Sequence, residues 1–253
     1  VGTTTPKKIA VIGGGPAGME FARTASQRGH SVDLFEKSDC LGGVLNMAAA
    51  PDFKADIKNY LEWSIRSVNM CDNVTVHLNT EAKPEDLSGY EVVVVAIGSE
   101  PIIPQFVKDN PNVVWVGDLE KGNATVGDDV VIVGAGLTGC ECALSLSKQG
   151  KNVTLVDMID EQSFGSGGAK FNQVALMGLL NDNHVKCIGN VKLVSNNNQL
   201  GFEHNGQSMD LAYDHVVLSL GVRPNPEVLS TFEDCANEVI YIGDCNTRIG
   251  TLY

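Results

Sequence analysis

The fold of this chain is decided by the stretch KIAVIGGGPAGMEFARTASQRGHSVDLFE, which runs from Lys8 to Glu36. The same 29-residue pattern returns 121 positions later as DVVIVGAGLTGCECALSLSKQGKNVTLVD, from Asp129 to Asp157. Five positions correspond, so that Gly13, Gly15, Gly18, Gly29 and Glu36 map onto Gly134, Gly136, Gly139, Gly150 and Asp157. The repeat predicts two units of similar local structure within one chain.

Each copy has the features of a strand, a tight turn and a helix. An apolar run, Ile9 to Ile12 or Val130 to Val133, predicts a buried parallel strand. The first glycine turns the chain, the second lets the backbone approach a pyrophosphate, and the third lets the helix pack closely on the strand. A second strand ends in Glu36 or Asp157, whose carboxylate can accept hydrogen bonds from an adenosine ribose. We therefore predict two dinucleotide cradles.

Composition and charge limit the class of protein. The 253 residues, 43% hydrophobic and 19% charged, are typical of a globular chain of one or two domains. A formal net charge of −13 argues against a nucleic-acid partner or an anionic membrane surface, since both attract basic patches. No apolar run approaches the roughly 20 residues that span a bilayer, and the N-terminus lacks a signal peptide's apolar core. We expect no nucleic-acid partner, no membrane association and a cytoplasmic location.

The cysteines and histidines indicate no disulfide framework and no metal site. The seven cysteines include no CxxC or CxxxxC pair, so the dithiol that a disulfide reductase needs is missing. Cys140 and Cys142 are two apart on a helix and point in different directions. The five histidines have no metal-ligand spacing. We expect packed thiols and no metal, and the roles of Cys140, Cys142 and Cys245 stay open.

Further strand signals close each unit. EVVVVAIGSEP (91–101) and DHVVLSLGVRPN (214–225) each predict a buried strand that runs into a glycine. EVIYIGDC (238–245) predicts a strand whose C-terminal end carries an aspartate, where ligands of open parallel sheets bind. Helices are expected over Phe53 to Val68 and Asn172 to Leu180. The glycine-rich stretch QSFGSGGAKF (162–171) is interpreted as a flexible loop rather than a phosphate site, because no strand precedes it.

These motifs together resemble the flavoproteins that bind two dinucleotides. The resemblance rests on GGGPAG with Glu36, AIGSEP, GAGLTG with Asp157, SLGVRPN and YIGDC. Within that superfamily, DCLGGVLNMAAAPDFKADIKNYLEW (39–63) is similar to the C-terminal half of the 2-enoate reductase and 2,4-dienoyl-CoA reductase family of old-yellow-enzyme-like NADH:flavin oxidoreductases. The resemblance implies an α/β fold with two Rossmann-like domains. A discontinuous FAD-binding domain, 1–106 and 229–253, would contain an inserted NAD(H)-binding domain, 107–228.

The resemblance also implies which residues bind the cofactors. For FAD it implies Gly13, Gly15, Gly18, Glu36 and Asp244, with Leu41, Gly42 and Gly43 nearby. For the nicotinamide cofactor it implies Gly134, Gly136, Gly139 and Asp157. The neighbouring cofactor-binding candidates are Pro16, Ala17, Lys37, Ala96, Gly98, Leu137, Thr138, Gly221 and Gly243. No catalytic residue is assigned, because hydride transfer between two cofactors requires no side-chain acid or base.

The residues after the second cradle favour NADH over NADPH. Asp157 is followed by Met158, Ile159, Asp160 and Glu161, so a 2′-phosphate would meet carboxylates instead of the arginine or lysine that it requires.

Family members carry a preceding barrel with FMN and a 4Fe-4S cluster. This chain begins at Val1 without Met and stops at Tyr253, where the family pattern has a final helix begin, so we expect a fragment. The expected function is hydride transfer from NADH to FAD, with electrons then passing to the FMN and iron-sulfur barrel that reduces an α,β-unsaturated substrate. Two alternatives stay open, a stand-alone NADH-dependent reductase for a partner protein and a structural module that binds only ADP. Neither the terminal substrate nor the oligomeric state is predicted.

Overall fold

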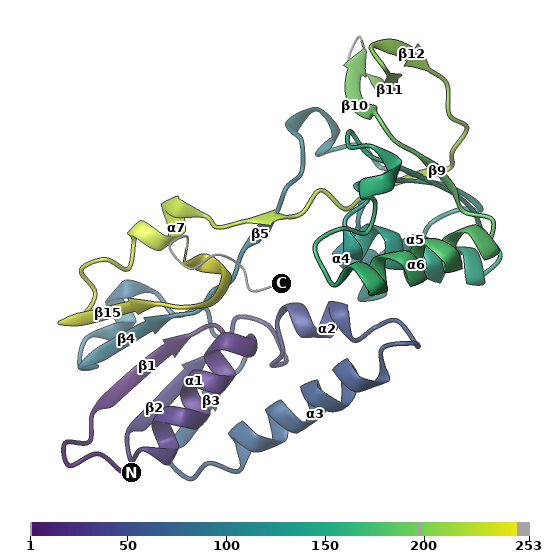
Figure 1. Ribbon diagram of the computed structural model, residues 1–253. Coiled ribbons are helices and arrows are strands. Elements are labelled where there is room, and N and C mark those ends of the chain that lie inside the picture. The colour runs from purple at the N-terminus through teal and green to yellow at the C-terminus, as the bar shows by residue number, and fades with distance from the viewer. Residues whose placement is uncertain (1, 197–198, 247–253) are drawn as a thin grey trace. The chain divides into compact units, whose positions relative to one another are not determined.

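The computed structural model describes residues 2–196 and 199–246, which form two compact units (Figure 1). Unit 1 contains the chain up to Glu100 and from Arg223 onward, and unit 2 contains Pro101–Val222. The segments that connect the units pair as β5 (Glu100–Pro101) and β14 (Val222–Arg223). The expectations about the chain ends and a final helix fall outside the described residues. The assignment of FAD and NAD(H) to the predicted domains stays a prediction.

Unit 1 is built on a five-stranded parallel sheet in the order β15-β4-β1-β2-β3. Its strands are β1 (Lys8–Ile12), β2 (Ser31–Phe35), β3 (Val74–His77), β4 (Val92–Val95) and β15 (Glu238–Tyr241). Both faces of β1 are buried, since Ile9 and Val11 pack in one core cluster while Ala10 and Ile12 pack in another. This two-sided burial explains the unbroken apolar runs in the sequence.

Helices lie on both faces of this sheet. One face carries α1 (Pro16–Gln27), α2 (Val44–Ala48) and α3 (Ala55–Asn69), and the short α7 (Pro226–Ser230) contributes Leu229 to the cluster on the other face. Met19 and Ala22 of α1 and Leu61 of α3 pack on the face that carries Val11 (Figure 1). The helix predicted at Phe53 to Val68 is therefore confirmed, with its start moved two residues along the chain. The short helix α2 was not predicted.

Unit 2 repeats the same topology. Its parallel sheet has the order β6-β13-β7-β8-β9. The strands are β6 (Val113–Trp115), β7 (Asp129–Val133), β8 (Asn152–Val156), β9 (Lys186–Ile188) and β13 (His215–Leu218). The fold class of two Rossmann-like units is thereby confirmed. The edge strand that pairs with β13 or β4 comes from a different part of the sequence in each unit. In unit 2 this strand is β6, which precedes the second copy of the repeat, whereas in unit 1 it is β15, from the far end of the chain.

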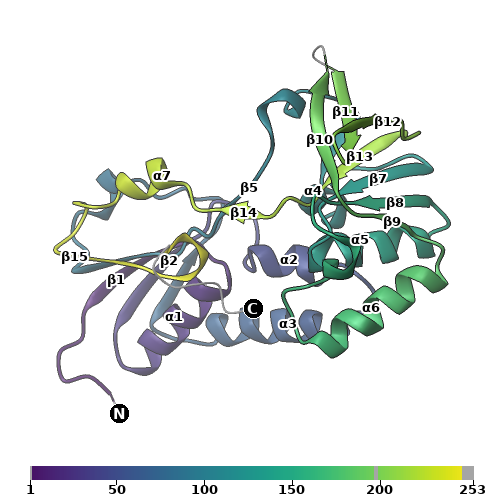
Figure 2. The ribbon, with the colours of Figure 1, turned by 45° about the horizontal axis from the view of Figure 1, so that its top comes forward.

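Two different layers cover the sheet of unit 2. The helices α4 (Val116–Glu120), α5 (Leu137–Lys148) and α6 (Lys170–Asp182) pack on the face of Val130 and Ile132. The opposite face, with Val131 and Val133, packs against a three-stranded antiparallel sheet (Figure 2). That sheet comprises β10 (Val191–Asn196), β11 (Gln199–His204) and β12 (Gln207–Met209). Among the described residues no helix has both the length and the apolar character needed to cross a membrane.

The interpretation of 162–171 as a flexible loop needs correction. Phe164 is completely buried in the core of unit 2. The N–H of Gly165 donates to the carbonyl of Ala135 at 2.8 Å, and the Gln173 side chain donates to the carbonyl of Phe164 at 2.7 Å. The loop is thus anchored beside the second glycine turn, because an aromatic side chain gains far more from burial than its glycine-rich surroundings suggest.

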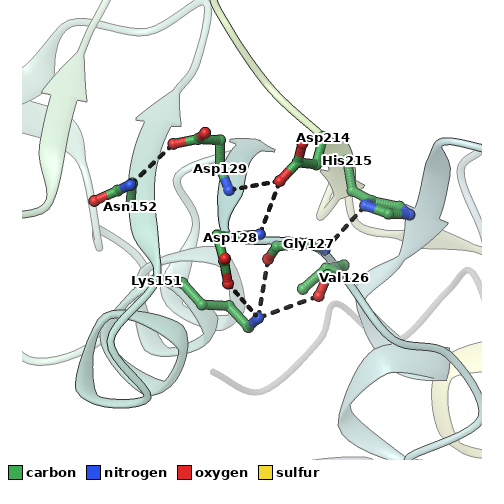
Figure 3. Close-up of polar contacts among 8 residues, drawn as sticks. All are labelled: Val126, Gly127, Asp128, Asp129, Lys151, Asn152, Asp214 and His215. Carbon is green, nitrogen blue, oxygen red and sulfur yellow. Dashed lines mark hydrogen bonds and ion pairs between the residues drawn. The ribbon is translucent and has the colours of Figure 1, made fainter.

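In each unit, one carboxylate accepts hydrogen bonds from backbone N–H groups at the amino-terminal edge of the parallel sheet. In unit 2, Asp214 Oδ2 accepts hydrogen bonds from the N–H groups of Asp128 at 2.8 Å and Asp129 at 3.0 Å (Figure 3). In unit 1, Glu91 Oε2 accepts from the N–H of Lys8, the counterpart of Asp129, at 2.9 Å. Glu91 directly precedes β4 and Asp214 directly precedes β13, so in each unit the residue before this strand satisfies the first amide of the central strand.

The segment entering β7 is also held by basic groups. Lys151 Nζ donates to the carbonyls of Val126 at 3.1 Å and Gly127 at 2.9 Å (Figure 3). The N–H of Gly127 donates to Nδ1 of His215 at 3.0 Å. These bonds connect the starts of β7, β8 and β13 at the edge opposite the glycine turn.

We expect Asp214→Ala to lower the thermal midpoint of unfolding, because two adjacent amides lose a charged acceptor. These backbone hydrogen bonds hold the pKa of Asp214 below its usual value. A carboxyl with a lowered pKa stabilises the fold above about pH 4 and stops doing so as the pH falls through the lowered pKa. The difference from wild type should therefore be present at pH 7 and shrink below pH 4, as measured by circular dichroism.

The matched control is Asp128→Ala, whose exposed carboxylate lies 3.9 Å from Lys151 Nζ. An exposed ion pair of this length contributes little, so this variant should unfold like wild type. Equal midpoints for Asp214→Ala and Asp128→Ala at pH 7 would show that the hydrogen bonds accepted by Asp214 do not stabilise unit 2.

Candidate functional site

Each glycine turn lies at the carboxyl end of the central strand of its unit. Gly13 and Gly134 follow β1 and β7 and have φ values of +105° and +109°, which side chains rarely adopt. At the third position of the motif, a Cβ added to Gly18 or Gly139 would collide with the carbonyl oxygen of Gly13 or Gly134. The first and third glycines are therefore required by the fold itself.

The second glycine of each turn faces open space. A Cβ added to Gly136 would meet nothing within 4 Å, and one added to Gly15 would have Gly43 Cα as its nearest neighbour at 3.9 Å. Both residues are N-caps of long helices, and neither α1 nor α5 has a side-chain cap or an acidic residue in its first turn. Uncapped amides and the positive end of the helix dipole favour an anion. The two helix starts thus fit the pyrophosphate of a dinucleotide.

A carboxylate lies beside each turn. Glu36 is only 9% exposed, and its Oε2 accepts from the N–H of Gly14 at 2.7 Å. Asp157 Oδ2 accepts from the N–H of Ala135 at 2.6 Å. Each carboxylate oxygen has further lone pairs, so both groups can accept hydrogen bonds from ribose hydroxyls. The structure brings together the glycines and the carboxylate that the repeat predicted in each unit.

Two distant segments complete the first cradle. The N–H of Gly42 donates to the carbonyl of Gly14 at 2.9 Å, and a Cβ on Gly43 would lie 2.9 Å from Gly15 Cα. From the far end of the chain, Gly243 approaches the start of α1, since its Cβ would lie 2.9 Å from the Cβ of Ala17. The half-buried Asp244 follows, and its backbone carbonyl accepts from the Ser99 hydroxyl at 3.1 Å. The strand β15 thus brings a carboxylate-bearing residue next to the residue that contacts the start of α1.

The other predicted cofactor-binding residues differ in burial and in backbone conformation. Ala96 is buried, and its carbonyl lies against Gly13. Gly98 and Gly221 turn the chain after the closing strands with φ values of +71° and +84°. The remaining candidates differ in exposure, with Pro16 and Ala17 half-buried at the start of α1 and with Leu137, Thr138 and Lys37 exposed.

Two residues of the first cradle are not predicted by the sequence pattern. Ser38 donates its N–H and its hydroxyl to Glu36 Oε1, at 2.9 and 2.7 Å. Gly14 leaves room for its neighbours, since a Cβ there would collide with Leu41 and lie 3.1 Å from Glu36 Oε2. A signal for Gly14 was present in the sequence, because the copy with glutamate has glycine at this position and the copy with aspartate has Ala135.

The buried thiols of Cys140, Cys142 and Cys245 are poor candidates for a nucleophile. All seven cysteines are free, and burial raises the pKa of Cys140 to about 12 and the pKa of Cys142 well above its usual value. Cys245 is buried with its Sγ 3.0 Å from the carbonyl of Ile242, and burial raises its pKa too. Protonated, packed thiols react poorly. Within the part of the chain that the structure describes, no three His, Cys, Asp or Glu side chains are grouped as a metal site requires.

Two known proteins with similar sequences are longer reductases. The chain is 33% identical to the bilirubin reductase of Mediterraneibacter gnavus over 97% of its own length and 39% of that protein. It is 32% identical to the cinnamate reductase of Clostridium sporogenes over 98% of its own length and 37% of that protein. The chain thus spans about two fifths of the length of these relatives.

A solved structure and a family model agree with these relatives. A 2-naphthoyl-CoA reductase, solved as a complex with 2-naphthoyl-CoA, superposes with a TM-score of 0.87 at 28% identity, covering 96% of this chain and 37% of that one. The model of the pyridine nucleotide-disulphide oxidoreductase family matches residues 7–242. Members of this family bind FAD and NAD(H), and both cradles fit such dinucleotides. The chain therefore belongs to the pyridine nucleotide-disulphide oxidoreductase family and, within it, to the 2-enoate reductase-like flavoproteins that bind two dinucleotides.

Proposed function

We propose that this chain is the NADH-oxidising, FAD-reducing part of a longer enoate-type reductase. The observation that carries the proposal is the pair of uncapped helix starts, each with an open glycine and an adjacent carboxylate, within one chain. Two such cradles suit a cofactor that gives a hydride and a cofactor that takes it. The NADH oxidase of Thermoanaerobacter brockii, 39% identical over 162 residues, supports NADH as the donor.

FAD is assigned to unit 1 because its cradle receives Gly243 and Asp244 from the far end of the chain, whereas the segment that reaches the second turn, at Gly165, lies within unit 2 itself. The α1 start would hold its pyrophosphate, Glu36 its adenosine ribose, and Asp244 its ribityl chain. Leu41, Gly42 and Gly43 lie against the same turn. When bound, FAD would supply the ring that accepts hydride from the nicotinamide, so the side chains need only bind and orient the two cofactors.

NADH is assigned to unit 2, and its carboxylates favour it over NADPH. Asp157 is followed by two further acidic residues that the backbone holds in place. Asp160 accepts from the N–H of Gln162 at 2.9 Å, and Glu161 accepts from the N–H of Gly189 at 3.3 Å. No lysine or arginine occurs from Asp157 to Ala169. A 2′-phosphate would add negative charge to this acidic segment without gaining a basic partner.

The final acceptor is assigned from the relatives. In this proposal electrons leave FAD for FMN and a 4Fe-4S cluster in a barrel outside this chain, where an α,β-unsaturated substrate is reduced. The cinnamate reductase and the 2-naphthoyl-CoA reductase support an unsaturated substrate, and the length of the relatives leaves room for such a barrel.

We expect the chain, reconstituted with FAD, to show flavin absorbance near 450 nm that NADH bleaches in anaerobic stopped-flow experiments. NADPH should bleach it about a hundredfold more slowly, because like charges brought together in a site cost several kcal/mol. Equal rates with both nucleotides would refute the assignment of NADH. Failure to take up FAD while binding ADP would instead favour the structural-module alternative.

The second glycine of the turn in unit 2, Gly136, provides a separate test of the proposed NADH site. We expect Gly136→Ala to fold as stably as wild type, because its Cβ meets no protein atom, but to lose at least about tenfold in NADH affinity when the methyl group blocks the pyrophosphate. Gly139→Ala is the contrasting variant, since its Cβ meets the Gly134 carbonyl, and overpacking of this kind costs about 1–3 kcal/mol of stability. Urea unfolding and calorimetric titration measure the two effects. Unchanged NADH affinity in Gly136→Ala would argue against this cradle.

A further inference from the structure

The two carboxylates are held to different degrees. Glu36 accepts three hydrogen bonds, one on Oε2 from Gly14 and two on Oε1 from Ser38, at 2.7, 2.9 and 2.7 Å. Asp157 accepts two, a short one from Ala135 at 2.6 Å and a longer one from the N–H of Ile159 at 3.3 Å. Glu36 is buried, whereas Asp157 is half-buried. Both oxygens of Glu36 are therefore held by hydrogen bonds of 2.9 Å or less, whereas one oxygen of Asp157 is held only by the bond of 3.3 Å.

The difference comes from the position two residues after the end of each copy of the repeat. Ser38 corresponds to Ile159, which is 41% exposed and has no polar side-chain atom. The hydroxyl of Ser38 has one proton and two acceptors within reach, Glu36 Oε1 at 2.7 Å and the carbonyl of Cys40 at 2.9 Å. A hydrogen bond to a charged acceptor is the stronger one, so the proton favours the carboxylate.

The packing around Glu36 also restricts the position of its carboxylate. Gly14 lies directly beneath this side chain, since a Cβ on Gly14 would lie 3.1 Å from both Glu36 Cβ and Glu36 Oε2. The same Cβ would collide with Leu41, a residue that is only 4% exposed. Glu36 is thus confined by the turn below it and by Ser38 at its end. An acceptor fixed before the ligand arrives loses little freedom on binding.

We propose that Ser38 is a positioning residue that aims the Glu36 carboxylate at the adenosine ribose, and that this makes the first cradle the one that retains its dinucleotide. Because Ile159 offers no hydroxyl, Asp157 must lose more freedom on binding, which suits a nucleotide that is exchanged at every turnover. The inference rests on the proposed function, since it takes the first cradle as the site of the resident cofactor.

The test uses ADP and 2′,3′-dideoxy-ADP, which differ only in the ribose hydroxyls. Titrations use the chain freed of FAD and are followed by amide resonances in nuclear magnetic resonance spectra. The N–H of Gly14 reports on the first cradle and that of Ala135 on the second, because each donates to the carboxylate of its own unit. Wild type should bind ADP more tightly than the dideoxy analogue at the Gly14 resonance. If wild type does not distinguish the two nucleotides there, the proposed function of this cradle is wrong.

Ser38→Ala removes the hydroxyl and keeps the N–H. We expect it to weaken ADP binding at the Gly14 resonance about tenfold, the typical effect of one hydrogen bond to a charged group, and to leave dideoxy-ADP binding unchanged. Ser38→Thr should restore wild-type affinity. An equal loss for both nucleotides would show a merely structural role for Ser38, and no loss for ADP would also overturn the inference.

Two further variants complete the test. Ser230→Ala is the matched control in unit 1, because its hydroxyl donates only to the backbone carbonyl of Glu227 within α7. It should leave both affinities unchanged. Ile159→Ser is the reciprocal change and should tighten ADP binding, but not dideoxy-ADP binding, at the Ala135 resonance. If Ser38→Ala does not fold, this gain decides the question, and its absence would overturn the inference.

Discussion

The close approach of each first helix to its strand is the constraint on which both cradles depend. Gly18 packs on the carbonyl of Gly13, and Gly139 packs on the carbonyl of Gly134, at distances that no Cβ would permit. This contact brings the uncapped starts of α1 and α5 to the carboxyl ends of β1 and β7. The helix amides and dipole then meet the space in front of the second glycine, where a pyrophosphate fits. Fold and binding site are therefore products of one packing contact.

The two units share this contact and differ in what the chain adds to it. In unit 1 the strand beside β4 is β15, from the far end of the chain, and it delivers Gly243 and Asp244 to the first turn. In unit 2 the corresponding strand is β6, which precedes the repeat and leads into α4 instead. Discontinuity of unit 1 is thus what gives its cradle additional groups. This difference supports a long, resident cofactor in the first cradle and an exchangeable one in the second.

The sequence predicted what is local and missed what depends on tertiary contacts. The central strands, α1, α5 and the glycine turns follow from patterns within 29 residues, where propensity and packing agree. Phe164 was missed because its glycine-rich neighbours give no periodicity, although its ring fills the core of unit 2. The hydrogen bonds that Glu91 and Asp214 accept at the starts of the central strands were missed because their donors lie more than 80 residues away along the chain. Ser38 was missed because a serine in a loop has many equivalent local interpretations.

The middle residue of each turn and the carboxylate that follows vary together. A methyl group at Gly14 would collide with Leu41 and lie 3.1 Å from Glu36, whereas the second turn holds Ala135 completely buried. An alanine in the first turn would have to displace Leu41 and would also press on Glu36. In the first turn the glycine, Leu41 and the carboxylate are therefore one packing unit rather than independent choices. In the proposed function this carboxylate binds the ribose, so the size of its neighbour in the turn would help to decide how firmly the nucleotide is held.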